Sequence, residues 1–164
     1  MCPSLPSDLP GTIDRLSLPE WFRSPLVSYS EKLIRMASPE CIVLYGSLAR
    51  GTYTKASDID LVVVSRHLPD SFFDRLAYLQ GLNDCGRAID AFAYTPEEFR
   101  DMLRRGHVTA LDALADGIPV HGEPFFAELR AEFQDMVRRG LHRSHCSWVL
   151  PPVRSAPGPN SRGD

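Results

Sequence analysis

The chain has 164 residues, of which 43% are hydrophobic and 24% are charged, and its formal net charge is -3. This length and composition suit one globular domain with its own core. No apolar run approaches the ~20 residues that cross a bilayer, and the start MCPSLPSDLPG lacks the basic and apolar regions of a signal peptide. We therefore expect a cytoplasmic protein that does not bind membranes.

The N-terminal part combines a proline-rich segment with a predicted helix. Residues 1–19 contain four prolines, which predicts an extended arm with little structure of its own. From Glu20 to Met36, apolar residues recur at roughly helical spacing. Pro25 favours a kink, or a helix start near it. We expect this helix to pack under a sheet.

Two short apolar runs, Ile42–Tyr45 and Leu61–Val64, flank a polar loop. Their β-branched residues and short lengths predict two buried strands. Between them, Gly46-Ser47 predicts a tight turn that opens a short helix, and such a turn presents free N–H groups to an anion.

The second run follows directly after Asp58-Ile59-Asp60. Side chains at i and i+2 of a strand share a face, so Asp58 and Asp60 project together with their Cα atoms roughly 7 Å apart. Two like charges on one face repel each other, and a cation would relieve that repulsion. A phosphate-binding turn beside a carboxylate pair predicts a nucleotide site with magnesium.

The rest of the chain alternates between predicted helices and strands. Asp70-Ser71 is expected to cap a helix to about Asn83, and Thr95 begins a capping box with Glu98. Pro119 suits an edge strand. The further predicted elements are a strand at 87–94, helices at 96–104 and 107–116, a short edge strand at 118–122 and a helix at 123–139.

Asp90 stands alone among apolar neighbours in the predicted strand 87–94. A buried, unpaired aspartate is costly, so its carboxylate is expected to meet a hydrogen-bond donor, a basic side chain or a metal. An ion pair with Arg87 is one alternative. Asp84 is a weaker candidate for chemistry because it lies in a predicted turn.

The C-terminal part differs in charge from the rest. Residues 138–163 hold five arginines and no acidic residue, and the end is rich in Pro, Gly and Ser. This composition predicts a basic, largely disordered tail over 141–164. A basic tail could touch nucleic acid or an acidic partner, but a solvated tail is the favoured interpretation, and we do not expect the chain as a whole to bind nucleic acid.

The spacing Gly46-Ser47-x-x-x-Gly51 followed by Ser57-Asp58-x-Asp60-Leu61 resembles the signature of the nucleotidyltransferase superfamily that includes DNA polymerase beta. The form GSLARG is most similar to the minimal nucleotidyltransferases that are often paired with a HEPN-domain partner. The resemblance covers roughly residues 20–125. It implies an α+β fold of two layers, with a small mixed sheet of three to four strands flanked by helices, and a minimal nucleotidyltransferase domain over 20–140.

The resemblance also implies the site residues. Asp58, Asp60 and Asp90 would be the catalytic carboxylates and the ligands of two Mg²⁺ ions, with Asp90 matching the family's third carboxylate. Gly46, Ser47, Arg50 and Ser57 would bind the nucleotide, with ATP as the expected donor. Lys55 could add positive charge in place of Arg50, and Arg50 could instead be a structural ion-pair residue.

The implied activity is transfer of a nucleoside monophosphate, usually AMP, to a hydroxyl. Three classes stay open: an antitoxin-like enzyme that modifies a separately encoded HEPN-like helical protein, an enzyme that modifies a small molecule of the aminoglycoside kind, and a binding module without catalysis. The complete set Gly46, Ser47, Asp58, Asp60 and Asp90 argues against the third class. A homo-oligomer is also possible.

Overall fold

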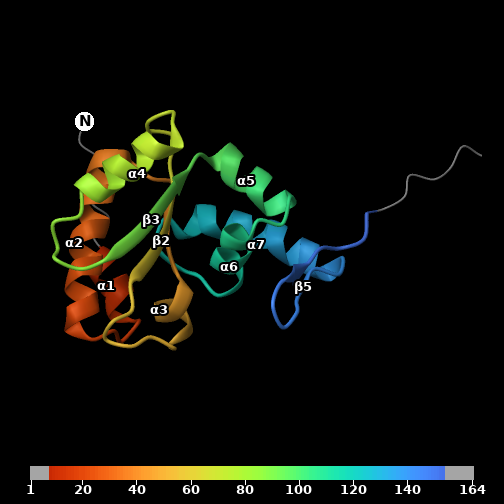
Figure 1. Cartoon of the computed structure of the whole chain (residues 1–164), viewed down its shortest axis with the longest axis horizontal. Coiled ribbons are helices and arrows are strands. Elements are labelled where there is room, and N and C mark those ends of the chain that lie inside the picture. Colours follow the sequence, from red (N-terminus) through yellow and green to blue (C-terminus); the bar gives the residue numbers. More distant parts are fainter. Residues whose placement is uncertain (1–7, 154–164) are drawn as a thin grey trace, which may run out of the picture.

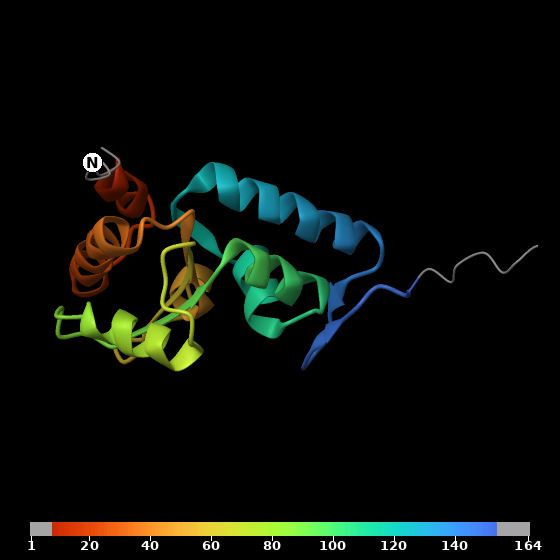
Figure 2. The same ribbon diagram turned by 90° about the horizontal axis from the view of Figure 1, so that it is seen from above.

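The computed structural model describes residues 8–153, and these residues form a four-stranded sheet with helices on both faces (Figures 1 and 2). The principal strands are β1 (Cys41–Tyr45), β2 (Ile59–Val64), β3 (Ile89–Tyr94) and β4 (Ile118–His121). The helices are α1 (Leu9–Asp14), α2 (Glu20–Ala37), α3 (Gly46–Arg50), α4 (Phe72–Gly81), α5 (Pro96–Arg104), α6 (Val108–Ala115) and α7 (Glu123–Arg138). A small hairpin pairs β5 (His142–Arg143) with β6 (Trp148–Val149).

The main sheet has the strand order β3-β2-β1-β4. Strands β1 and β2 run antiparallel and are joined through α3 and a loop, whereas β2 and β3 run parallel and are joined through α4. A parallel connection requires a crossover, which α4 supplies. Strand β4 pairs antiparallel with β1 at an edge, where Pro119 is tolerated. The predicted mixed sheet flanked by helices is therefore confirmed.

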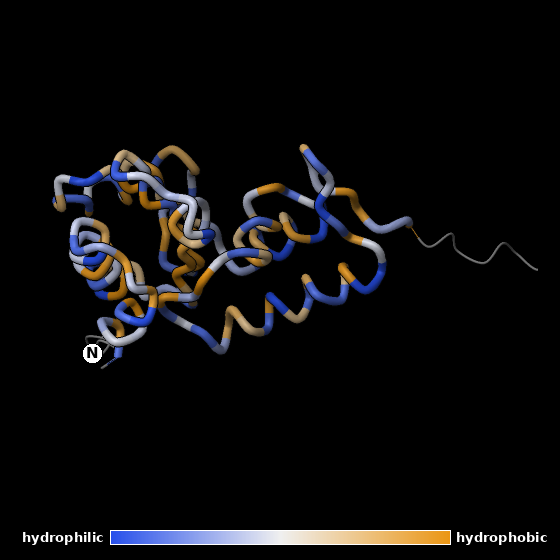
Figure 3. Tube along the Cα trace, turned by 90° about the horizontal axis from the view of Figure 1, so that it is seen from below, coloured by the Kyte–Doolittle hydropathy of each residue, from blue (hydrophilic) through white to orange (hydrophobic). Residues whose placement is uncertain are grey.

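Strands β1 and β2 bury both of their faces, which is why they read as nearly continuous apolar runs. Ile42, Leu61 and Ala91 point into the core beneath α1, α2 and α4. Val43 and Val62 point into a second core beneath α5, α6 and α7. Figure 2 shows these two groups of helices on opposite sides of the sheet. The alternating hydropathy along α7 in Figure 3 fits a helix that covers one core and faces water on its other side.

Hydrogen bonds from side chains fix α2 against α4. The Tyr29 hydroxyl donates to the Leu79 carbonyl at 2.8 Å, and the Tyr78 hydroxyl donates to the Met36 carbonyl at 3.0 Å. The Ser71 hydroxyl caps α4 by accepting from the Asp74 amide. Helix α2 continues through Pro25 without ending there.

The prediction of an extended N-terminal arm is wrong within the described residues, because Leu9–Asp14 forms helix α1. Pro10 stands in the first turn, where the helix needs no amide donor. Leu9 and Ile13 are buried in the core, and Asp14 pairs with Arg23 of α2. Burial of these two apolar side chains thus stabilises a helix in a segment whose proline content predicts little structure. Residues 1–7 lie outside the described residues.

The prediction of a largely disordered tail from residue 141 is also wrong for its first part. The hairpin β5–β6 packs on the body of the protein, with the Trp148 ring edge-on to Phe133 at a centroid distance of 5.8 Å. The Trp148 indole N–H donates to Asp112 at 2.9 Å, and Arg143 pairs with Asp112 and Asp116. Residues 154–164 lie outside the described residues.

Among the helices of residues 8–153, none has both the length and the apolar character that crossing a bilayer requires.

Trp148→Ala should loosen the hairpin without disturbing the main sheet. We expect a loss of about 1–3 kcal/mol in the free energy of unfolding, because a partly buried aromatic ring and one hydrogen bond are lost. Amide exchange should rise over 142–149 and stay unchanged in β1–β3. Val149→Ala, on the same strand and 41% exposed in the parent, is the matched control. Equal stabilities for the two variants would contradict this packing role.

Candidate active site

The strand register brings two of the predicted carboxylates side by side. Asp60 is the second residue of β2 and Asp90 the second of β3, and the two are direct partners in the parallel ladder. Neighbouring strands lie about 4.8 Å apart, and paired residues point to the same face. Asp58 lies two residues before Asp60, where the chain enters β2. The three predicted carboxylates therefore gather at one end of the sheet.

Asp60 is half-buried, and its surroundings disfavour its charge. The pKa of Asp60 is raised from 3.8 to about 6, mainly by burial and then by the negative charges of Asp90 and Asp58, while Arg50 opposes the shift. Tyr45, the partner of Asp60 on β1, has its pKa raised by burial and by Asp60. The unliganded protein therefore holds concentrated negative charge here that a cation would relieve.

Gly46 allows the start of α3 to lie against Asp60. Its φ of +71° is in the left-handed region that favours glycine. A Cβ at this position would overlap Oδ2 of Asp60 and come within 3.1 Å of Cγ. The turn after β1 and the carboxylate of β2 are therefore in contact only because residue 46 has no side chain.

The other predicted nucleotide-binding residues surround this turn in different ways. Ser47 is half-buried, and its carbonyl accepts from the Thr52 amide at 3.0 Å. Arg50 is exposed and has no ion-pair partner among residues 8–153. Lys55 extends over the Trp21 ring, 5.4 Å from its centroid. The Ser57 hydroxyl accepts from the Thr54 amide at 2.9 Å, which gives it a role in holding the loop.

Asp90 is exposed, so the expectation of a buried aspartate in need of a partner is wrong. Strand β3 is an edge of the sheet, and the carboxylate faces solvent there. The alternative of an ion pair with Arg87 is not realised either. Arg87 instead donates hydrogen bonds to the carbonyls of Lys55 and Ser57. Asp90 is therefore accessible to a ligand.

The carboxylates do not form a complete metal cage by themselves. Within residues 8–153, no three His, Cys, Asp or Glu side chains are placed so that they could hold one metal ion by themselves. Mg²⁺ does not require such a cage, because proteins usually bind it through one or two carboxylates completed by water and substrate phosphate. Asp60, half-buried beside two other carboxylates and against the open backbone at Gly46, suits that mode of binding.

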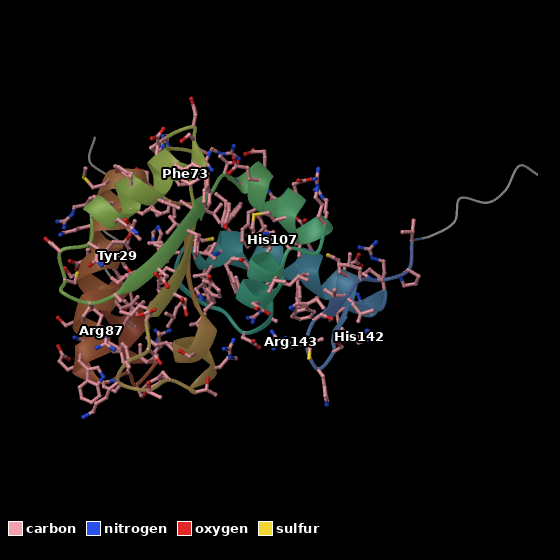
Figure 4. All side chains as sticks on the ribbon, in the orientation of Figure 1. Tyr29, Phe73, Arg87, His107, His142 and Arg143 are labelled. Atoms are coloured by element: carbon pink, nitrogen blue, oxygen red, sulfur yellow. The ribbon has the colours of Figure 1, made fainter. Side chains whose placement is uncertain are left out.

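A cavity of about 340 Å³ opens next to Arg50. Its walls are the exposed end of α3, the first turns of α6 and the hairpin turn Ser144–Ser147 together with Trp148. Arg143 of β5 is labelled in Figure 4, and its guanidinium pairs with the carboxylates of Asp112 and Asp116. This volume falls within the range of small-molecule sites.

Sequence reasoning missed Arg87, Asp112 and Trp148. The sequence pattern suggests for Arg87 only an ion pair with Asp90, and Trp148 stands in a segment predicted to be disordered. The apolar run Trp148-Val149-Leu150 within this segment is the signal that it packs against something.

Comparison with known proteins gives one family and a few structural neighbours. Residues 28–109 match the family model described as "Nucleotidyltransferase domain". No curated protein sequence matches the chain. A chain from a crystal structure of a toxin-antitoxin with AMP-PNP is 21% identical with a TM-score of 0.45, covering 67% of this chain and 85% of that one.

A second neighbour comes from a crystal structure of a mutant of the toxin-antitoxin MntA-HpeT. It is also 21% identical, with a TM-score of 0.39, and covers 66% of this chain and 87% of that one. Likeness at this level does not extend an activity or a partner to the present chain.

Asp60→Asn should stabilise the metal-free protein in a pH-dependent way. The folded-state pKa of about 6 lies above the ordinary value of 3.8, so the ionised carboxylate lowers stability once the pH rises through this window, and contributes nothing below it. The melting temperature of the variant relative to the parent, measured in chelator, should therefore increase between pH 4 and pH 7. Asp70→Asn, on an exposed loop, is the control and should show no such trend.

Gly46→Ala should be more damaging than Gly51→Ala, although both residues have φ near +70°. Each change forces a left-handed conformation on a residue with a Cβ, which costs about 1–2 kcal/mol. Only at position 46 does the Cβ also meet Asp60, because the space around Gly51 is open. Thermal melts and Mg-nucleotide titrations of the two variants should differ accordingly. Two equal variants would show that the contact with Asp60 is unimportant.

Proposed function

This chain belongs to the nucleotidyltransferase domain family, and we propose that it transfers AMP from ATP, with Mg²⁺, to a hydroxyl on a separately encoded helical protein of the HEPN kind. The observation that carries the proposal is the in-register pairing of Asp60 and Asp90 on β2 and β3, with the backbone of Gly46 against Asp60. Two carboxylates beside a turn that a phosphate can approach supply what transfer of a nucleotide requires.

The residues divide into two roles. Asp58 and Asp60 would hold two Mg²⁺ ions, with Asp90 completing the site nearer the acceptor. Bound there, the ions would neutralise phosphate charge and lower the pKa of the attacking hydroxyl. Gly46 and Ser47 would bind the β- and γ-phosphates through backbone N–H groups and a hydroxyl. Arg50 would add a positive charge beside them.

In the proposed reaction, the acceptor oxygen forms a bond to the α-phosphorus, and the bond between that phosphorus and the bridging oxygen breaks. Pyrophosphate leaves with the electron pair of the broken bond. The proton of the acceptor hydroxyl passes to a carboxylate, and Asp90 suits this role because it is exposed beside Asp60.

A protein acceptor is supported by the openness of this end of the sheet. Asp58 and Asp90 are both exposed, so a hydroxyl on a flexible segment of a partner can reach them. The GSLARG form of the turn, which resembles the minimal nucleotidyltransferases paired with HEPN proteins, supports the same choice. We propose residues 20–140 as the catalytic domain.

The cavity beside Arg50 favours a second candidate, transfer to a small molecule. Its 340 Å³ would hold a compact acceptor between α3, α6 and the hairpin. No sequence pattern indicates such a pocket, because its outer wall lies in the segment predicted to be disordered. An aminoglycoside-type acceptor is the alternative of this class.

Asp58→Asn and Asp60→Asn should each abolish transfer while the protein stays folded, since each removes a ligand charge from the proposed metal pair. Calorimetric titration should show weaker binding of Mg-nucleotide in both variants. Asp74→Asn, at the exposed start of α4, provides a charge-matched control. Full transfer by both site variants would remove these residues from the mechanism.

The acceptor can be identified by co-expressing the chain with the product of the adjacent gene and measuring intact masses. We expect the adjacent protein to gain the mass of one AMP residue, and to lose that gain with Asp90→Asn, while the two chains still co-purify. Incubation with labelled ATP and aminoglycosides runs in parallel. Transfer to an aminoglycoside and to no protein would move the assignment to the second candidate.

A further inference from the structure

The loop 51–58 brings Asp58 to the site, yet it forms few backbone hydrogen bonds with the rest of the protein. The Thr52 amide donates to Ser47, and Ser57 and Thr54 bind each other within the loop. Outside these bonds, its carbonyls need donors from elsewhere. The position of Asp58 therefore depends on what holds the segment just before it.

Arg87 supplies those donors. Its Nη2 donates to the Lys55 carbonyl at 2.5 Å and to the Ser57 carbonyl at 3.1 Å. Ser57 directly precedes Asp58, so the second bond fixes the peptide that leads into the predicted metal ligand. A guanidinium suits this task because its donors lie in one plane with fixed geometry.

An aromatic platform holds the guanidinium in place. The Arg87 Cζ lies 4.1 Å from the centroid of the Phe22 ring, and Phe22 is fully buried in α2. The other side of the loop rests on the same platform, because Tyr53 packs edge-on to Phe22 at 5.3 Å. Figure 4 shows Arg87 beside α2, away from the cavity at the hairpin.

The backbone of Arg87 is fixed as well. The side-chain amide of Asn83 donates to the Arg87 carbonyl at 2.8 Å, and the chain enters β3 two residues later. Asp90 is the second residue of that strand. One side chain therefore links the loop that carries Asp58 to the strand that carries Asp90.

We propose that Arg87 is a positioning residue for the metal-nucleotide site, which holds the Lys55–Ser57 segment so that Asp58 is preorganised beside Asp60 and Asp90. The effect of Arg87 on nucleotide binding rests on the proposed function, whereas its hydrogen bonds to the loop do not depend on that function. Arg87 does not itself touch the nucleotide in this scheme. It acts through the two carbonyls, as outer-shell partners of metal ligands do.

The experiment compares the parent, Arg87→Ala, Arg87→Lys and the control Arg66→Ala. Arg66 pairs with Glu40 and Glu97 at the opposite end of β2, so its loss removes a charge and surface ion pairs without touching the loop. Two quantities are measured: amide hydrogen exchange over 52–58, and the Kd for Mg²⁺ with a non-hydrolysable ATP analogue by calorimetry. Circular dichroism and thermal melts report on the global fold.

We expect Arg87→Ala to raise exchange over 52–58 and to weaken binding on the order of 10- to 100-fold, the range typical of outer-shell partners. Arg87→Lys keeps the charge but loses the planar fork, so it should restore both quantities only in part. Arg66→Ala should match the parent in both.

Parental exchange and parental affinity in a folded Arg87→Ala would overturn the proposal. If Arg87→Ala does not fold, the test rests on Arg87→Lys. Parental exchange and parental affinity in Arg87→Lys would show that the positive charge alone matters, and would overturn the proposed role of the planar guanidinium. If the loop exchanges faster in Arg87→Ala but the parent binds no Mg-nucleotide, the proposed function is refuted. The role of Arg87 in holding the loop is then still supported.

Discussion

The site depends on placing like charges side by side at the end of a sheet. Asp60 and Asp90 are direct partners on parallel strands, and Asp58 adds a third negative charge. Such an arrangement is unfavourable in isolation, and the pKa of Asp60 is raised first by burial and then by the charges of Asp90 and Asp58. The sheet tolerates it because β1 and β2 bury both faces along the rest of their length. The apolar part of each strand thus stabilises the fold that holds its charged end.

This constraint explains several features of the surrounding backbone. Gly46 has no Cβ because Asp60 occupies the space where one would lie. The β1 turn and the β2 carboxylate are therefore fitted to each other, and a phosphate held by the turn would lie near the carboxylates. The positive charge of Arg50 acts to lower the pKa of Asp60, and so offsets part of the repulsion among the carboxylates. Arg87 restrains the loop 51–58 through hydrogen bonds to the carbonyls of Lys55 and Ser57.

Most of the fold could be predicted because its signals are local. The apolar runs of β1 and β2 and the capping box at Thr95 are visible in short windows, and Thr95 and Glu98 do form that box. The alternation of side chains in a strand has a period of two, so the shared face of Asp58 and Asp60 is predictable, whereas only the family resemblance points to Asp90. What failed depended on tertiary burial. Helix α1 forms because Leu9 and Ile13 find a core, and no local pattern in a proline-rich segment reveals that.

The same reasoning separates what was predictable in the site from what was not. The family resemblance points to Asp90 on its strand, but its exposure follows from the edge position of β3, which requires the strand order. The sequence alone does not decide whether Arg87 pairs with Asp90 or with the carbonyls of the loop 51–58. Only the register of β2 against β3, together with the Phe22 ring in α2, selects the loop. Contacts between segments about 30 residues apart are fixed by the whole fold, so single-sequence patterns do not resolve them.

The C-terminal hairpin bears on how such a small domain could acquire an acceptor. Asp112 accepts from Trp148 and pairs with Arg143, so one carboxylate on α6 anchors both strands of the hairpin. The turn Ser144–Ser147 is exposed and borders the cavity beside Arg50. Its sequence can therefore change without disturbing the sheet that holds the carboxylates. Acceptor choice would then lie in the hairpin turn and in any partner that covers it, while the chemistry would stay with Asp58, Asp60 and Asp90.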